Sequence, residues 1–221
     1  MKQLVLALYA EGSTDERFLP RIIQRTAEHL LARYGVEILD PHVVNGDIHS
    51  RATLQEQIVA AAKETRGYHI LIVHQDADAP DQERALQERI QPGLDLAQQE
   101  PEHYQQDIVP LIPVRMIEAW MLADPVALCQ AIPSCPTPDE LNLPHKPEQV
   151  EHISDPKAEL ARITRIYQTR RRRSRSRSYL AKIQERLADE IAIERLKRVP
   201  AYQTFEQKFA QVLHELHFLD Q

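Results

Sequence analysis

The segment QLVLALYA (residues 3–10) decides the fold class. It is a short, nearly continuous apolar run, which is typical of a strand buried on both faces of a parallel sheet. Outward along the chain, three further segments have the character of strands: VEILDPHVV (36–44), YHILIVHQ (68–75) and DIVPLIPVR (107–115). Pro110 and Pro113 favour a sheet edge or a bulge for the last strand, because proline cannot donate to a strand ladder.

Helical patterns lie between these strands. Apolar residues recur at helical spacing from Phe18 to Leu31 and from Leu54 to Ala62, and a polar helix with a thin apolar stripe is expected over about residues 81–99. The alternation predicts an α/β protein with a mostly parallel sheet of about four strands and flanking helices on both faces.

The strand pattern stops after Met116, and the remainder of the chain is predicted to be helical. Prolines between residues 133 and 147 make an irregular connection there, which favours a subdomain boundary. We therefore expect an α/β domain over residues 1–125 and a helical C-terminal subdomain over residues 126–221. The helices are expected near residues 116–131, 155–168, 178–198 and 202–218.

The composition indicates a soluble protein with its own core. The 221 residues include 27 Lys and Arg against 33 Asp and Glu, for a formal net charge of −6, and 43% are hydrophobic. A chain of this length buries roughly 70% of the surface that its unfolded form exposes. No apolar run approaches the roughly 20 residues of a membrane helix, so we expect neither a membrane span nor a signal peptide. Cys129 and Cys135 cannot build a disulfide framework, and a cytoplasmic location in a reducing cytosol is expected.

Six of the positive charges are concentrated within eight residues near the start of the third C-terminal helix. A basic segment on an acidic body indicates an anionic partner, and guanidinium groups suit the phosphates of nucleic acid. The alternative is a solvated loop between two helices. No aromatic residue lies within the segment, so backbone contacts are expected rather than base recognition. The segment contains Arg170, Arg171, Arg172, Arg173, Arg175 and Arg177.

Carboxylates follow the predicted strands. Glu11 ends the first strand, Asp76 and Asp78 end the third, and Glu118 lies just past the fourth. Ligands of open α/β sheets bind beyond the carboxyl ends of the strands, and neighbouring strands are about 4.8 Å apart, so these acids are expected to converge. Residues two apart on a strand share a face, so Asp76 and Asp78 are expected to point the same way.

Such a cluster repels itself unless a cation compensates its charge, and carboxylate oxygens suit Mg²⁺ or Mn²⁺. Each acid also has a structural alternative. Glu11 could complement a helix N-terminus, Asp76 and Asp78 could be turn or cap residues, and Glu118 could be an ordinary polar position on a helix. Asp81 is expected to be a helix N-cap.

The histidines and cysteines give no signal for a second kind of metal site. A histidine in a buried strand, such as His74 or His69, is expected to be a hydrogen-bonded core residue rather than a ligand. Cys129 and Cys135 lack the second ligand pair of a structural zinc site, so we expect no zinc.

Several motifs in this order resemble the TOPRIM-related domain-of-unknown-function family 4276. The resemblance spans nearly the whole chain. The motifs are AEGSTDERF (10–18), QDAD (75–78), IEAWMLAD (117–124), DPK (155–157) and FEQKF (205–209).

The resemblance implies a TOPRIM-like, Rossmann-like fold and a metal site, as in topoisomerases, primases and overcoming-lysogenization-defect nucleases. Glu11, Asp76 and Asp78 would form its acidic core, with Glu118 as a further acid by looser analogy and Lys157 as a charge stabiliser. Members often resemble components of bacterial and phage-defence loci, sometimes beside ATPases. Fold alone does not determine activity.

The expected function is Mg²⁺- or Mn²⁺-dependent hydrolysis of phosphodiester bonds in nucleic acid. Asp76 and Asp78 would be ligands, Glu11 a ligand or general base, and Glu118 part of a second metal site. Lys157 or Arg115 would neutralise charge on the phosphate, although Arg115 also fits an ordinary surface residue.

Two other classes of function remain open. The first is a catalytically weak metal-binding module that docks nucleic acid or an effector and works with a partner ATPase. The second is phosphoryl or nucleotidyl transfer to a small molecule. A homodimer is compatible with the sequence, but no interface can be assigned to it.

Overall fold

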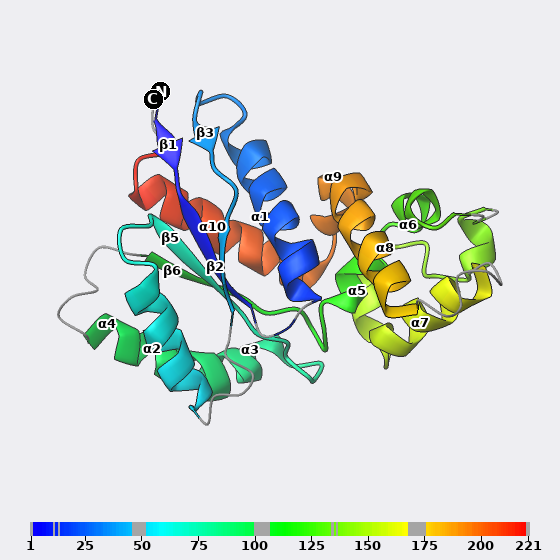
Figure 1. Cartoon of the computed structure of the whole chain (residues 1–221), viewed down its shortest axis with the longest axis horizontal. Coiled ribbons are helices and arrows are strands. Elements are labelled where there is room, and N and C mark those ends of the chain that lie inside the picture. The colour runs from blue at the N-terminus through cyan, green and yellow to red at the C-terminus, as the bar shows by residue number, and fades with distance from the viewer. Residues whose placement is uncertain are drawn as a thin grey trace.

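The protein is an α/β structure, described here by a computed structural model that covers residues 2–10, 12, 14–45, 52–99, 107–133, 135, 137–167 and 176–219 (Figure 1). Its central sheet has four parallel strands in the order β4-β2-β5-β6. They are β2 (Leu6–Ala10), β4 (His42–Asn45), β5 (Ile70–His74) and β6 (Asp107–Leu111). Two short parallel strands, β1 (Gln3–Leu4) and β3 (Glu37–Ile38), pair beside them. The expected α/β class and the four-stranded parallel sheet are confirmed.

Two apolar layers cover the sheet, one on each face. Alternate residues of a strand point to opposite faces, so Leu6 and Leu8 join one cluster and Ala7 and Tyr9 the other. The first cluster packs against α1 (Asp15–Leu31) and α10 (Pro200–Glu215). The second packs against α2 (Leu54–Glu64) and α4 (Gln91–Gln99), on the opposite side of the sheet (Figure 1).

The expected polar helix over residues 81–99 is one continuous stretch with an irregular middle. It consists of α3 (Gln82–Ala85), the π-helical turn η1 (Leu86–Ile90) and α4. Asp81 caps it, because its side chain accepts a hydrogen bond from the Arg84 backbone N–H at 2.9 Å. The N-cap expected at Asp81 is confirmed.

The helix expected over residues 116–131 is divided in the structure, so that expectation was wrong. It forms α5 (Glu118–Met121) and α6 (Pro125–Ala131), with Asp124 between them. Proline cannot continue a helix but suits its first turn, and the Asp124 carboxylate accepts the N–H groups of Val126 and Ala127 there. The helix expected over 178–198 is likewise divided into α8 (Ser176–Glu190) and α9 (Ile193–Leu196).

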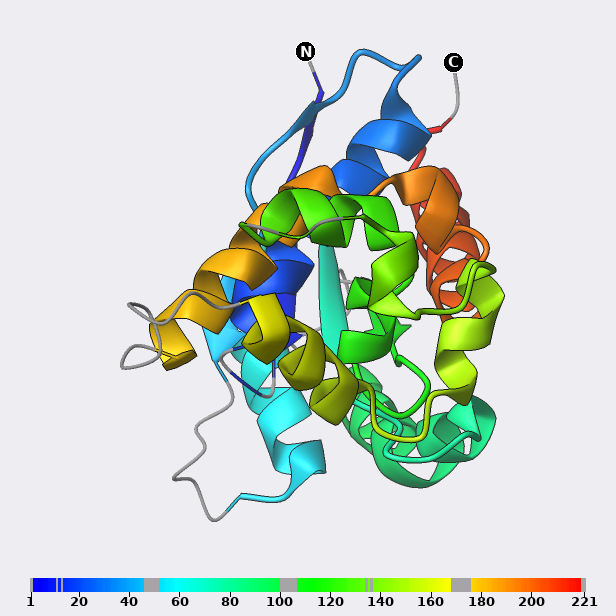
Figure 2. The ribbon, with the colours of Figure 1, turned by 90° about the vertical axis from the view of Figure 1, so that its right-hand side faces the viewer.

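The remaining elements complete a helical group beside the sheet. The helices from α5 to α9 gather in front of the strands when the molecule is viewed from the right-hand side of Figure 1 (Figure 2). The elements between α6 and α8 are the 3₁₀ turns η2 (Asp139–Leu141) and η3 (Pro147–His152) and the helix α7 (Pro156–Tyr167). Cys129 and Cys135 are joined by a disulfide, a local link that the sequence analysis did not expect.

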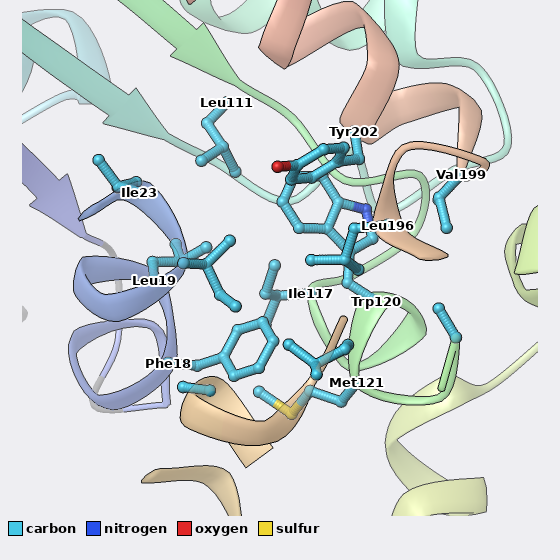
Figure 3. Packing of buried hydrophobic residues seen from close by; sticks show 14 of the residues in the cluster. Phe18, Leu19, Ile23, Leu111, Ile117, Trp120, Met121, Leu196, Val199 and Tyr202 are labelled. Atoms are coloured by element: carbon cyan, nitrogen blue, oxygen red, sulfur yellow. The ribbon is translucent and has the colours of Figure 1, made fainter. Parts of the chain in front are cut away.

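The helical group and the sheet share one apolar core. Trp120 of α5 meets Tyr202 of α10 edge-on, with ring centroids 5.2 Å apart, and Phe18 of α1 lies near Met121 (Figure 3). Such an aromatic pair adds about 0.5–1.5 kcal/mol beyond its area burial. The same cluster runs from Leu4 to Phe218, and the domain boundary expected at residue 125 stays a prediction. Within the part of the chain that the structure describes, no helix is both long and apolar enough to cross a membrane.

Candidate metal centre

A pocket of about 430 Å³ opens beyond the carboxyl ends of β2 and β5, where the first turns of α1, α5 and α7 meet. It gathers four residues that the sequence analysis proposed for the site, from three separate parts of the chain. Glu11 lies outside the described residues, although Gly12 beside it lines the pocket. The lining residues are Gly12, Thr14, Asp15, Asp76, Asp78, Met116, Glu118 and Lys157.

Asp76 is the most perturbed acid of the pocket. Its side chain is 25% exposed, and Oδ1 accepts a hydrogen bond from the Ile117 backbone N–H at 2.9 Å. Burial raises the pKa of Asp76 to about 7; nearby His74 and the Ile117 N–H lower it, whereas Asp15 and Glu118 add to the rise. Without a bound cation, the positive charge near Asp76 is therefore too small to offset the cost of burying its carboxylate.

Glu118 and Lys157 form the opposite part of the pocket. Glu118 begins α5 and is buried, and burial raises the pKa of its carboxyl group. Its own backbone N–H and the charge of Lys157 lower that pKa, whereas Asp15 raises it. Lys157 stands in the first turn of α7, which Asp155 caps by accepting the Ala158 N–H at 2.8 Å.

Asp78 lines the same pocket but does not follow the strand geometry that we expected to align it with Asp76. β5 ends at His74, and Asp78 has a left-handed backbone with φ 55°. Its carboxylate pairs with Arg89, whose Nη1 lies 3.0 Å from Oδ2, and 64% of the side chain is exposed. The same Arg89 nitrogen donates to the carbonyl oxygens of Asp76 (3.1 Å) and Ala77 (3.4 Å).

The backbone of Arg115, the alternative phosphate-binding residue, is hydrogen-bonded to the backbone of Asp78. The Asp78 N–H donates to the Arg115 carbonyl at 2.8 Å, and Arg115 also has a positive φ, of 62°. A left-handed conformation is uncommon for either residue type, so this pair of turns is held by its surroundings. The Arg115 Nε atom is buried and has no hydrogen-bond partner among the described residues.

Three residues of the site were missed by sequence reasoning. Asp15 is buried beside the pocket, and its Oδ2 accepts the Gly12 N–H at 2.8 Å. His74 Nε2 lies 3.6 Å from Asp15 Oδ1 and 3.7 Å from Asp76 Oδ1. Asp15 had a signal in the sequence, because it stands in the same motif as Glu11. His74 is the buried, hydrogen-bonded strand residue that we expected, but its position beside Asp76 was not predicted. Arg89 had none, because its reach depends on the π-helical turn that contains it.

The pKa of His74 depends on its burial and on the two neighbouring acids, Asp15 and Asp76. Burial lowers the pKa of His74, whereas Asp15, Asp76 and the Leu111 carbonyl raise it, and the net direction is upward. At 3.6 Å the Nε2 contact with Asp15 is too long for a hydrogen bond, so the carboxylates act on the imidazole by their charge.

The residues of the pocket fit a divalent cation by their chemistry. Asp15, Asp76 and Glu118 supply carboxylate oxygens, the donors that Mg²⁺ and Mn²⁺ prefer. The buried Nε2 of His74 also has no hydrogen-bond partner among the residues that the structure describes. As they stand, no three His, Cys, Asp or Glu side chains in the described part of the chain are spaced to enclose an ion. The fit therefore requires small side-chain movements or the carboxylate of Glu11.

The side chains of the basic segment lie outside the described residues, so their distance from this pocket is not defined. Residues 170–173 and 175, which are five of its arginines, lie outside the described residues. Arg177 belongs to the first turn of α8, but its side chain also lies outside the description. The proposed contact with phosphates stays a prediction.

The chain was compared with known families and proteins. No curated protein and no solved structure matches it. One family model matches residues 10–210, and its description is Domain of unknown function (DUF4276). Because this match covers most of the chain, the protein belongs to the DUF4276 family.

Proposed function

We propose that the protein is a Mg²⁺- or Mn²⁺-dependent phosphodiesterase that cleaves nucleic acid in this pocket. The observation that supports the proposal best is the pocket beyond the strand ends, which brings Asp15, Asp76, Glu118 and Lys157 together. Burial among these acids raises the pKa of Asp76 to about 7. Burying several carboxylates together lowers the stability of the fold unless a cation compensates their charge. Acids with perturbed pKa values are therefore found most often at functional sites. The TOPRIM-like relationship suggested by the motifs belongs to the same proposal.

Asp15, Asp76 and Glu118 would hold the ion, together with Glu11 as the sequence motif suggests. A divalent ion in such a site lowers the pKa of a bound water and neutralises charge on the phosphate. The hydrogen bond from Ile117 to Asp76 Oδ1 fixes one carboxylate oxygen and leaves Oδ2 available. Asp15 is fixed in the same way through Oδ2, by the Gly12 N–H, which leaves Oδ1.

Lys157 would act on the substrate. Lys157 supplies the one side-chain cation that lines the pocket among the described residues, and it would neutralise charge that develops on the phosphate. Glu118 stays a ligand of the ion in this arrangement, and burial raises the pKa of its carboxyl group, which a bound cation would lower. Arg89 would act indirectly, by holding the segment from Asp76 to Asp78 in position.

A second candidate is a catalytically weak metal-binding module that needs a partner, such as an ATPase, for activity. The ion pair between Asp78 and Arg89 favours this candidate, because it occupies one carboxylate of the Asp-Ala-Asp motif. In this case a partner would have to rearrange the segment before Asp78 could bind a metal ion.

Cleavage assays separate the two candidates. Single-stranded DNA, duplex DNA and RNA would be incubated with the protein in EDTA, Mg²⁺ or Mn²⁺. We expect metal-dependent cleavage that falls by about a hundredfold or more in Asp76→Asn and Glu118→Gln. Asp95→Asn is the matched control, because Asp95 is an exposed acid on α4 that bonds only Gln91 among the described residues. Cleavage that survives in both site variants would contradict the proposal, and metal binding without cleavage would favour the partner-dependent module.

A further inference from the structure

The side chain of His74 is buried next to the acids of the pocket. It is the last residue of β5, and only 1% of its side chain is exposed. Its Nδ1 lies 3.2 Å from the Leu111 carbonyl oxygen of the neighbouring strand. A carbonyl oxygen only accepts hydrogen bonds, so Nδ1 carries the hydrogen and donates it. In the neutral imidazole, the lone pair is therefore on Nε2.

Nε2 is buried without a hydrogen-bond partner among the described residues. The nearest acceptors in the pocket are carboxylate oxygens, at 3.6 Å (Asp15 Oδ1) and 3.7 Å (Asp76 Oδ1). Both exceed hydrogen-bond length. When the imidazole is neutral, a nitrogen lone pair and two carboxylate oxygens thus face one volume that burial keeps from water, an arrangement that is unfavourable without a positive charge. A proton on Nε2 relieves it, which raises the pKa of His74, and a bound cation that displaces this proton would relieve it in the same way.

Each of the two carboxylates accepts a hydrogen bond from a backbone N–H. Asp15 Oδ2 accepts the Gly12 N–H, and Asp76 Oδ1 accepts the Ile117 N–H. In Asp15 the bonded oxygen differs from the one that faces Nε2, whereas in Asp76 the same Oδ1 meets Ile117 and faces Nε2, so an ion would share Oδ1 or bind Oδ2. His74 is held as well, through Nδ1. This is the usual support of metal-bound histidine, whose second ring nitrogen donates to a backbone carbonyl or a carboxylate.

We propose that His74 Nε2, Asp15 and Asp76 are ligands of one divalent metal ion, and that this nitrogen ligand makes the site selective for Mn²⁺ or another first-row transition ion over Mg²⁺. This inference rests on the proposed function, which it deepens by naming the ion. Imidazole is a ligand of transition metals, whereas Mg²⁺ prefers an all-oxygen shell.

The distances require only a small adjustment. Donors bound to one ion at about 2.1 Å lie roughly 3.0–3.4 Å from each other in octahedral or tetrahedral geometry. The observed separations of 3.6 Å and 3.7 Å exceed this range by a few tenths of an ångström. The described side chains do not enclose an ion as they stand, so binding would draw the two carboxylates towards Nε2 by this amount.

The direct test is electron spin echo spectroscopy of the full-length protein loaded with Mn²⁺. A coordinated imidazole produces ¹⁴N modulation, which a site built only of oxygen ligands does not show. We expect this modulation in the wild type and in His145→Gln, the matched control, because His145 is exposed outside the pocket. We expect its loss in His74→Asn, which keeps an N–H donor for Leu111 but removes Nε2.

Metal selectivity gives a second readout. We expect the Mn²⁺ affinity of His74→Asn to fall by about tenfold or more, with a smaller change in Mg²⁺ affinity, so that the ratio of the two affinities decreases. Bound Mn²⁺ without ¹⁴N modulation in the wild type would overturn the inference, and this measurement does not depend on whether the variant folds. An unchanged affinity ratio in folded His74→Asn would also overturn it.

The outcomes also separate this inference from the proposed function. Cleavage without ¹⁴N modulation would leave the phosphodiesterase standing and reject His74 as a ligand. Modulation without cleavage of any nucleic acid would support the ligand assignment and reject the phosphodiesterase. Absence of Mn²⁺ binding would reject the ligand assignment, and absence of both Mn²⁺ and Mg²⁺ binding would reject the phosphodiesterase as well.

Discussion

The carboxylate of Asp76 accepts a hydrogen bond from the Ile117 backbone N–H, with Oδ1 and N 2.9 Å apart. This contact joins the segment after β5 to the residue that precedes α5, and α5 begins with Glu118. Two acids that lie 42 positions apart in the sequence are thereby held at one pocket. The contact also separates the structural role of Asp76 from its charge, because an amide oxygen accepts the same hydrogen bond.

Replacing Asp76 by Asn should therefore keep the fold and raise its stability in EDTA at pH 8. The raised pKa of Asp76 means that its ionised form is less stable in the folded state than in the unfolded chain. Removing the charge should add on the order of 1 kcal/mol, or about 2–4 °C in Tm by thermal unfolding. The gain should shrink at pH 5, where the folded protein keeps the proton. A Tm that falls by several degrees, with Asp95→Asn unchanged, would contradict this account.

Metal binding should strengthen as the pH rises through 7. Below a pKa of about 7 the carboxyl group of Asp76 holds a proton, which the metal ion must displace. The proton on Asp76 alone predicts that the Mn²⁺ affinity decreases about tenfold from pH 8 to pH 6, and a proton displaced from His74, whose pKa is also raised, would make the decrease larger. Titrations at pH 6, 7 and 8 would measure this, and an affinity that does not change over that range would be inconsistent with Asp76 as a ligand.

Arg89 should stabilise the segment that follows β5. Its Nη1 bonds two backbone carbonyls and the Asp78 carboxylate, so Arg89→Ala should cost about 1–2 kcal/mol and speed amide hydrogen exchange over residues 76–79. Arg84→Ala is the control, because Arg84 is an exposed neighbour paired only with Glu88 through its side chain. That change should alter stability by less than about 0.5 kcal/mol. Equal effects of the two substitutions would show that Arg89 does not hold this segment.

Asp124, the last acid of the IEAWMLAD motif, should matter for stability rather than for metal binding. It is buried, accepts two N–H groups in the first turn of α6 at 3.2 Å, and accepts the Ala192 N–H at 3.1 Å. Asp124→Ala leaves these donors unpaired and should cost about 2–4 kcal/mol by denaturant unfolding. Asp189→Ala removes an exposed pair with Arg21 and a negative charge near Arg25, and should cost less than about 1 kcal/mol. A loss of Mn²⁺ affinity in folded Asp124→Ala would be evidence against this division of roles.

The basic segment should contribute to nucleic-acid affinity through charge. Replacing its six arginines, which lie between residues 170 and 177, by glutamine should weaken binding and flatten the dependence of affinity on salt. Binding would be measured at several salt concentrations with Asp76→Asn protein, to prevent cleavage. An unchanged salt slope would refute phosphate contacts by this segment.

The sheet was predictable because strand burial is a local property of the sequence. Apolar runs at residues 3–10 and 68–75 favour strands buried on both faces. The structure confirms the second run as β5 and divides the first into β1 and β2, which belong to different sheets. The break at Asp124 was missed because the apolar positions on either side fit one continuous helical pattern. Pro125 was the available signal, since proline is most frequent in the first turn of a helix.

The residues of the site could be predicted only where they follow a strand or belong to a motif. They identified Asp76, Glu118 and Lys157, which the structure brings to one pocket. They did not identify His74 as part of it, because its orientation depends on the Leu111 carbonyl of a strand 37 residues away. The pairing of Asp78 with Arg89 depends on a left-handed backbone and a π-helical turn, and neither is apparent from residue spacing.

The central claim is that this pocket binds a divalent metal ion through Asp76, and calorimetric titration with Mn²⁺ at pH 8 tests it most directly. The account predicts saturable binding to the wild type and to Asp95→Asn, and none, or binding weaker by about a hundredfold, to Asp76→Asn. Absence of binding to the wild type, or equal binding to Asp76→Asn, would contradict it.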